Sequence, residues 1–156
     1  MVVDATARLY DVDEDSVVFT KLQQTQKYDQ GTIEFHARKG KLISLEKLHE
    51  SIWASRLSDG TRSGLVSLEV DVVGKVRTTD DKTLLQVAGT DEQFELCPHP
   101  DEEHAAAFEN LLAGAGNNVI ELSGRVDNYK GRWPTVLRRR PAKPRKILVT
   151  GFKIVP

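Results

Sequence analysis

The most regular alternation of hydrophobic and polar residues begins at Leu65, in "LVSLEVDVVGKVRTT". A period of two residues is typical of a strand with one buried face. The residues expected to point inward are Leu68, Val70, Val72 and Val76. Those expected to point outward are Glu69, Asp71, Lys75 and Arg77. Gly74 lies near the middle of this strand, where a glycine predicts a bulge or a bend.

Further short apolar segments predict more strands: "TLLQVAG", "EQFELC", "NVIELSGRVDN" and "KILVTGFKIVP". The first two flank a turn at Gly89-Thr90-Asp91, and "TVL" is a candidate for another short strand. In the last two segments, the residues expected to point inward are Ile120, Leu122, Val126, Leu148, Phe152 and Ile154.

A helix is predicted between the third and fourth of these strands. Pro100 suits its first turn, and the carboxylates of residues 101–103 suit the positive end of the helix dipole. Its apolar side comprises Ala107, Phe108, Leu111 and Leu112. Gly114 and Gly116 predict its end.

The first third of the chain predicts a strand followed by a helix. In "GTIEFHARKG" the apolar residues Ile33, Phe35 and Ala37 alternate with polar ones. In "SLEKLHESIWASRLS" Ser44 suits the N-cap of a helix. The apolar stripe of that helix comprises Leu45, Leu48, Ile52 and Trp53.

Residues 11–26 leave two interpretations open. "ARLYDV" and "SVVFTKLQ" read as two strands joined by the acidic turn Asp13-Glu14-Asp15. Alternatively, the second segment forms a weak helix that continues through Gln23 to Gln26.

From Leu65 the predicted order is strand, strand, strand, helix, strand, strand, which resembles an oligonucleotide/oligosaccharide-binding (OB) fold. The resemblance implies a five-stranded Greek-key barrel. It also implies ligands that lie across strands two and three, between the loops joining strands one to two and four to five. We therefore expect an α+β chain with an N-terminal α/β segment, residues 1–62, packed on an OB-like barrel, residues 63–156.

The front segment has a second resemblance. "GTIEFHARKGKLISLEKLHESIWASRL" followed by "LVSLEVDVVG" is similar to the strand-helix-strand second half of heavy-metal-associated, ferredoxin-like domains. That family binds soft metals through Cys-x-x-Cys near its first helix, and this chain has one cysteine, Cys97. The resemblance implies the architecture, with a remnant of a metal-homeostasis protein as one alternative function.

Charge is distributed unevenly although the net charge is only −1. Residues 117–156 hold ten basic and two acidic residues, a balance of +8, which leaves −9 for residues 1–116. The basic residues concentrate in "SGRVDNYKGRWPTVLRRRPAKPRK", residues 123–146. Such asymmetry favours a polyanionic partner, or attraction between the two parts of the chain.

If the barrel is correct, Asp127 to Lys146 forms the loop between strands four and five. Its aromatic side chains can stack on unpaired bases, and its cations can neutralise phosphates. The candidate ligand-binding residues are Tyr129, Lys130, Arg132, Trp133, Arg138, Arg139 and Arg140. A solvated hairpin, or a contact with a protein or with the chain's own acidic half, explains the same composition.

The predicted outward residues of strands two and three weigh against nucleic acid. They are Gln86, Ala88, Gln93 and Glu95, with neither an aromatic nor a basic residue among them. The sequence also lacks a G-x-S-x-G elbow, a P-loop and G-x-G-x-x-G. We therefore expect a non-enzymatic binding or adaptor module of unknown ligand, with weak single-stranded nucleic-acid binding as the alternative.

Metal-ligand residue types gather in "CPHPDEEH", where Cys97, His99 and His104 are the candidates. Their spacing matches no standard zinc motif, so we expect neither a metal nor another cofactor. No apolar run is long enough to span a bilayer, and "MVVDATARLY" does not resemble a secretory signal. A cytoplasmic protein without a membrane contact is the expectation.

Overall fold

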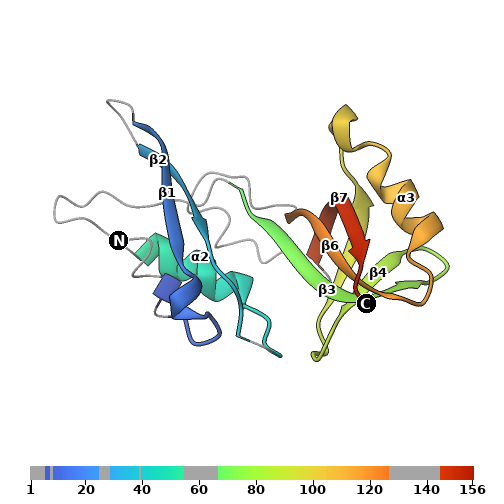
Figure 1. Cartoon of the computed structure of the whole chain (residues 1–156), viewed down its shortest axis with the longest axis horizontal. Helices are drawn as coiled ribbons and strands as arrows, with labels where there is room; N and C mark the ends of the chain where they lie inside the picture. The colour runs from blue at the N-terminus through green and yellow to red at the C-terminus, as the bar shows by residue number, and fades with distance from the viewer. Residues whose placement is uncertain (1–5, 8, 25–28, 39, 55–66, 127–144) are drawn as a thin grey trace. The chain divides into compact units, whose positions relative to one another are not determined.

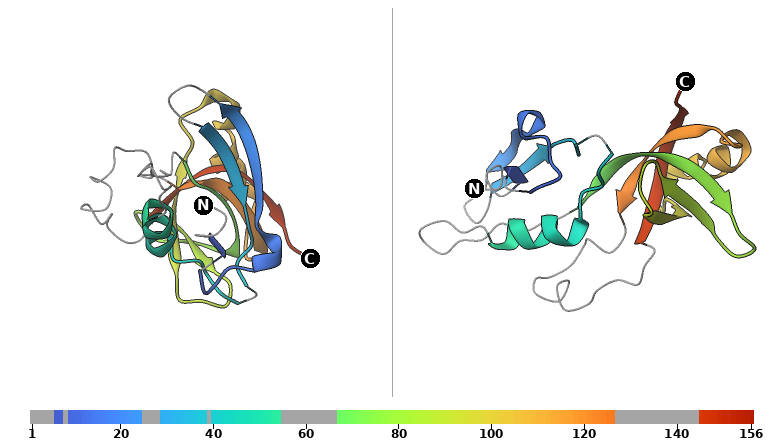
Figure 2. Two further views of the ribbon diagram at one scale, coloured as in Figure 1. Left: turned by 90° about the vertical axis from the view of Figure 1, so that its left-hand side faces the viewer. Right: turned by 90° about the horizontal axis from the view of Figure 1, so that it is seen from below.

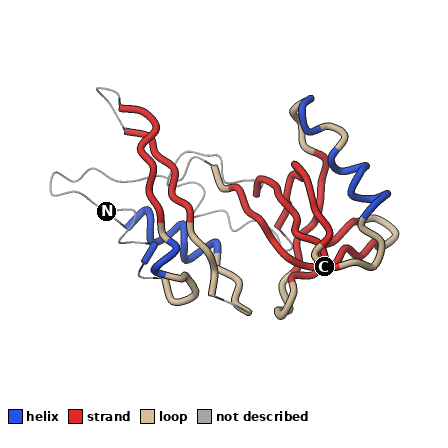
Figure 3. Tube along the Cα trace, viewed as in Figure 1, coloured by secondary structure: helices blue, strands red, loops and turns tan. Residues whose placement is uncertain are grey.

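The computed structural model describes residues 6–7, 9–24, 29–38, 40–54, 67–126 and 145–156. The chain has α+β architecture and divides into two compact units, Met1–Leu65 and Val66–Pro156. Figure 1 labels most of their helices and strands, and Figure 3 colours the same trace by secondary structure. No described helix is both long and apolar enough to cross a membrane.

The first unit contains a two-stranded antiparallel sheet of β1 (Val18–Gln24) and β2 (Asp29–Glu34). The interpretation of residues 11–26 is thereby settled in favour of a strand, which follows the 3₁₀ turn Glu14–Ser16. The first of the two predicted strands, "ARLYDV", is wrong, because Val12 makes only an isolated bridge to Ala37. Backbone turn bonds, including Val12 N–H to Leu9 O at 3.4 Å, coil this segment instead.

Helix α2 (Leu45–Ala54) begins where Ser44 predicted it. The Ser44 Oγ accepts a hydrogen bond from the Lys47 backbone N–H at 3.3 Å, which satisfies an N–H group of the first turn. Leu45, Leu48 and Ile52 are buried, which confirms the predicted stripe. The side chain of Trp53 lies outside the described residues.

The ferredoxin-like arrangement implied by the front segment is not formed. In that arrangement the strands before and after the helix belong to one sheet. Here β2 pairs with β1, whereas β3 (Glu69–Thr78), the next strand after α2, belongs to a separate five-stranded sheet. The local helix signals were correct, but strand partners depend on long-range packing that local patterns do not encode.

The second unit is built on a five-stranded mixed sheet (Figures 1 and 2). Its members, besides β3, are β4 (Thr83–Val87), β5 (Gln93–Pro98), β6 (Val119–Val126) and β7 (Arg145–Ile154). They pair in the closed order β3-β4-β5-β7-β6, because β6 also pairs with β3. Every pairing is antiparallel except that of β5 with β7.

Strand β3 is shared between two partners. It pairs with β6 from Glu69 to Lys75 and with β4 from Gly74 to Thr78. Both registers are continuous through Gly74, so the predicted bulge is wrong. A Cβ at Gly74 would overlap the Gln86 backbone oxygen. The glycine therefore permits close backbone approach where β3 passes from one partner to the other.

Alternation predicted the buried face of β3 and β6 correctly. Leu68, Val72, Ile120, Leu122 and Val126 are buried, and the odd-numbered residues 69–77 are exposed. The rest of this core comes from β4, β5, α3 and β7. Its members are Leu85, Val87, Phe94, Leu96, Leu111, Ala115, Ile147 and Val149.

The predicted inward face of the last strand needs correction. Ile147 and Val149 are fully buried, whereas Leu148 is only half-buried and Ile154 is 51% exposed. The β6–β7 register shifts where Ser123 faces Gly151 and Gly124 faces Val149. The extra residue in β7 reverses the alternation, and a single period-two reading cannot fit both halves of a bulged strand.

The predicted helix after Pro100 is shorter than expected. A 3₁₀ turn, Glu102–His104, comes first, and α3 spans Ala107–Gly114. Leu111 is fully buried but Leu112 is 48% exposed, which corrects its assignment to the apolar side. A helix of two turns covers the sheet with one narrow stripe, here Leu111 and Ala115, four residues apart.

Gly74→Ala is expected to lower the free energy of unfolding by about 1–3 kcal/mol, because its methyl group would overlap the Gln86 oxygen. Chemical denaturation monitored by circular dichroism measures the change. The matched control is Gly151→Ala, since a Cβ at Gly151 meets no atom within 4 Å. Equal effects of the two substitutions would contradict the role assigned to Gly74.

Candidate functional site

The seven residues predicted to bind a ligand, Tyr129 to Arg140, all lie outside the described residues, as does "TVL". The two attachments of this segment are described. Val126 at the end of β6 pairs with Ile147 of β7, and both side chains are buried. The predicted loop boundary is also corrected, because Arg145 and Lys146 already belong to β7.

These attachments determine where the basic segment leaves the sheet. Residues 127–144 hold six basic residues and one acidic residue. Because their ends join neighbouring strands of one ladder, this positive charge is tethered at one end of the β6–β7 pair. Arg125 and Lys146 add to it within the strands, at half-buried and exposed positions.

The outer face of β4 and β5 contains the polar residues that the sequence predicted. Gln93 Nε2 donates a hydrogen bond to Gln86 Oε1 at 2.9 Å, and Lys82 Nζ lies 3.7 Å from Glu95 Oε2. Glu95 is therefore partly neutralised. On this part of the surface, the repulsion between Glu95 and a phosphate is therefore weaker than the sequence suggested.

Sequence reasoning overlooked the neighbouring strand β3. Lys75 pairs directly with Gln86 across the β3–β4 ladder, and Arg77 follows on the same exposed face. No hydrogen bond or ion pair within the described part of the chain engages either cation. The alternation of β3 revealed both side chains as outward, but the register that places them beside β4 was not visible in the sequence.

A surface pocket of about 390 Å³ lies at this position. It is lined by residues of β3, β4, the β4–β5 turn and the start of β6. The set comprises Gly74, Lys75, Arg77, Gln86, Val87, Ala88, Gly89, Thr90, Asp91 and Val119. Its size falls in the range of small-molecule sites, and two cations and one carboxylate make its lining net positive.

Hydrogen bonds hold the β4–β5 turn that forms one wall of this pocket. Gln86 Nε2 donates to the Thr90 and Glu92 backbone oxygens at 2.9 and 3.3 Å. Thr90 Oγ1 donates to Val87 O at 3.3 Å and accepts from the Glu92 N–H at 3.2 Å. Gly89 has φ 73°, a conformation that favours glycine. The wall is therefore preorganised.

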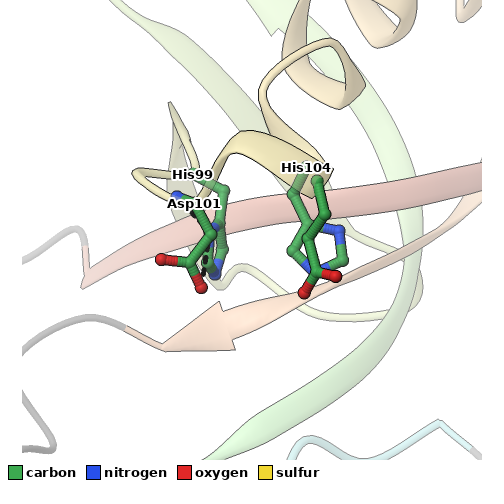
Figure 4. Close-up of polar contacts among 4 residues, drawn as sticks. His99, Asp101 and His104 are labelled. Carbon is green, nitrogen blue, oxygen red and sulfur yellow. Dashed lines mark hydrogen bonds and ion pairs between the residues drawn. The ribbon is translucent and has the colours of Figure 1, made fainter.

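The metal-ligand candidates do not form a coordination site. His99 and His104 contact each other edge to face, with ring centroids 4.9 Å apart (Figure 4). Within the described ranges, no three His, Cys, Asp or Glu side chains are grouped so that they could hold a metal ion. Cys97 is half-buried in β5, where it is paired with Leu148 of the neighbouring strand β7.

The His99 side chain is buried and makes a local hydrogen bond. It is 7% exposed, and its Nδ1 accepts a hydrogen bond from the Asp101 backbone N–H at 3.1 Å. The Asp101 carboxylate lies farther away, with Oδ2 3.8 Å from Nδ1. His104 Nε2 lies 3.1 Å from Glu103 Oε1. These contacts tie the turn before α3 to the end of β5.

Compared with known proteins, the chain matches no family model, no curated protein and no solved structure. Functional inference therefore depends on the residues described above.

His99→Ala is expected to lower the free energy of unfolding by about 1–3 kcal/mol, since it removes a buried ring and the acceptor of the Asp101 N–H. The loss should be the same with and without added zinc in thermal denaturation. Asp101→Ala is the control, because it keeps the backbone N–H. A zinc-dependent stabilisation that His99→Ala abolishes would contradict this structural role.

Proposed function

We propose that the five-stranded sheet is an OB-like Greek-key barrel. The support is its topology, in which α3 lies between the third and fourth strands and the only parallel ladder among the described strands joins the third and fifth. The shared first strand and its glycine allow such a small sheet to close. OB folds are binding scaffolds, although the fold alone does not identify a ligand.

The proposed function is that of a non-enzymatic binding or adaptor module whose contact surface is the basic segment, residues 123–146. The observation that supports it is the pairing of Val126 with Ile147. This pairing tethers the basic residues of the segment to a buried core. Loops carried by a rigid scaffold are where binding residues concentrate. Clustered basic residues in the sequence strengthen attraction to an acidic surface.

The preferred partner is an acidic protein surface. Arginine binds carboxylates through paired hydrogen bonds, and the segment contains three consecutive arginines, 138–140. Prolines 134, 141 and 144 restrict the backbone and reduce the entropy lost on binding. The acidic first part of the chain, which carries −9, is the internal competitor for the same cations.

Single-stranded nucleic acid is the second candidate. The strand order favours it, because OB folds bind oligonucleotides across strands two and three. The cations Lys75 and Arg77 border that surface on β3. Against it, the described outer residues of β4 and β5 include no aromatic side chain on which a base could stack. Stacking would depend on Tyr129 and Trp133.

The variant Arg138→Ala/Arg139→Ala/Arg140→Ala is expected to lose a protein partner that the native chain retains after nuclease treatment. Affinity capture followed by mass spectrometry identifies the partner, and titration of the purified pair measures its affinity. Loss of three charged contacts predicts at least about a hundredfold weaker binding. Lys82→Ala, which removes a cation outside the segment, is the control. Equal loss in both variants would contradict the proposal.

For the nucleic-acid candidate, a mixed-sequence single-stranded oligonucleotide should quench tryptophan fluorescence strongly at low salt and weakly at physiological salt. Trp133→Ala should abolish the quenching, whereas Trp53→Phe should preserve it. The absence of quenching at low salt would exclude this candidate, because electrostatic attraction is strongest there.

A further inference from the structure

A second feature of the barrel, separate from the basic segment, is the pocket beside Lys75 and Arg77. It borders Val119 at the start of β6, whereas the basic segment leaves from Val126 at the end of the same strand. Val119 and Val126 are seven residues apart, which corresponds to about 23 Å along an extended strand. The pocket is lined entirely by described residues, and none of them belongs to the segment.

Lys75 and Arg77 outnumber the one carboxylate of the lining. Lys75 and Arg77 are two residues apart on β3, so their side chains leave the same face about 7 Å apart. Two other described cations of this unit have acidic partners. Lys82 is paired with Glu95, and Lys153 lies 3.0 Å from Glu121. Within the described residues, Lys75 and Arg77 have no such partner.

The β4–β5 turn adds different chemistry to the lining. Asp91 lies on the braced β4–β5 turn and contributes the one carboxylate of the lining. Ala88 and Val119 add apolar side chains to the lining. A matching ligand combines an anionic group, a hydrogen-bond donor and a compact body.

We propose that this pocket binds a small phosphate ester that carries sugar hydroxyl groups, the chemistry of a pentose phosphate or a nucleoside monophosphate. The phosphate would contact Lys75 and Arg77, because a guanidinium donates paired hydrogen bonds to phosphate oxygens. A hydroxyl group would donate to Asp91. The net positive lining favours a ligand with net negative charge over a zwitterion such as a free amino acid.

Ribose 5-phosphate is the probe, with ribose as its neutral counterpart, titrated into the isotope-labelled full chain and followed by amide NMR. Ribose 5-phosphate should give saturable shifts confined to residues 74–77, 86–91 and 119, and ribose should give none. Lys75→Ala/Arg77→Ala should weaken binding at least about tenfold. Lys82→Ala/Lys153→Ala, which removes equal charge elsewhere, should leave the affinity within about twofold.

Three results would overturn the proposal. They are an absence of saturable shifts at millimolar ribose 5-phosphate, equal weakening by the two double variants, and shifts confined to residues 123–146. The last result would assign phosphate binding to the basic segment. It would therefore support the polyanion contact of that segment while excluding the pocket, so the two proposals can fail separately.

Asp91→Ala tests the sugar end of the ligand. Inorganic phosphate should bind this variant slightly more tightly, because a repulsive carboxylate is gone. Ribose 5-phosphate should lose its hydroxyl contact, so its affinity relative to inorganic phosphate should fall about tenfold. A substitution of Thr90 would not test this contact, because the Thr90 hydroxyl group holds the turn. An unchanged ratio would overturn the assignment of a hydroxylated ligand.

Discussion

The close approach of β3 and β4 at Gly74 is the constraint on which the second unit depends. At this residue, one strand is hydrogen-bonded to β6 on one side and to β4 on the other. Any side chain there would overlap the backbone of Gln86. Gly124 plays a related part on β6, where a Cβ would overlap Ile147. Small residues at tight contacts let the five strands pack closely around one core.

Local patterns predicted much of this fold because burial of one strand face has a clear sequence period. Leu68, Val72, Ile120 and Leu122 were identified as core residues by alternation alone, and Ser44 predicted the start of α2. The failures share a physical cause. The bulge near Gly151 and the partner of β3 are determined by contacts between distant residues, which a local period does not contain.

The candidate sites were predictable to different degrees for the same reason. A run of arginines is visible in composition, so the basic segment could be identified without a structure. The pocket could not, because Lys75 and Asp91 come together only through the β3–β4 register and the turn held by Gln86. Their outward direction was evident from alternation, but their proximity was not. Ligand sites that depend on register require the fold first.

The two positively charged regions also differ in how they attract a ligand. The pocket borders Val119 and the segment is attached at Val126, two positions about 23 Å apart along β6. The segment has high charge, and attraction between exposed charges falls with salt. The pocket has low net charge and a preorganised wall, so its selectivity depends on geometry. The two proposals thus assign two different kinds of binding surface to one small sheet.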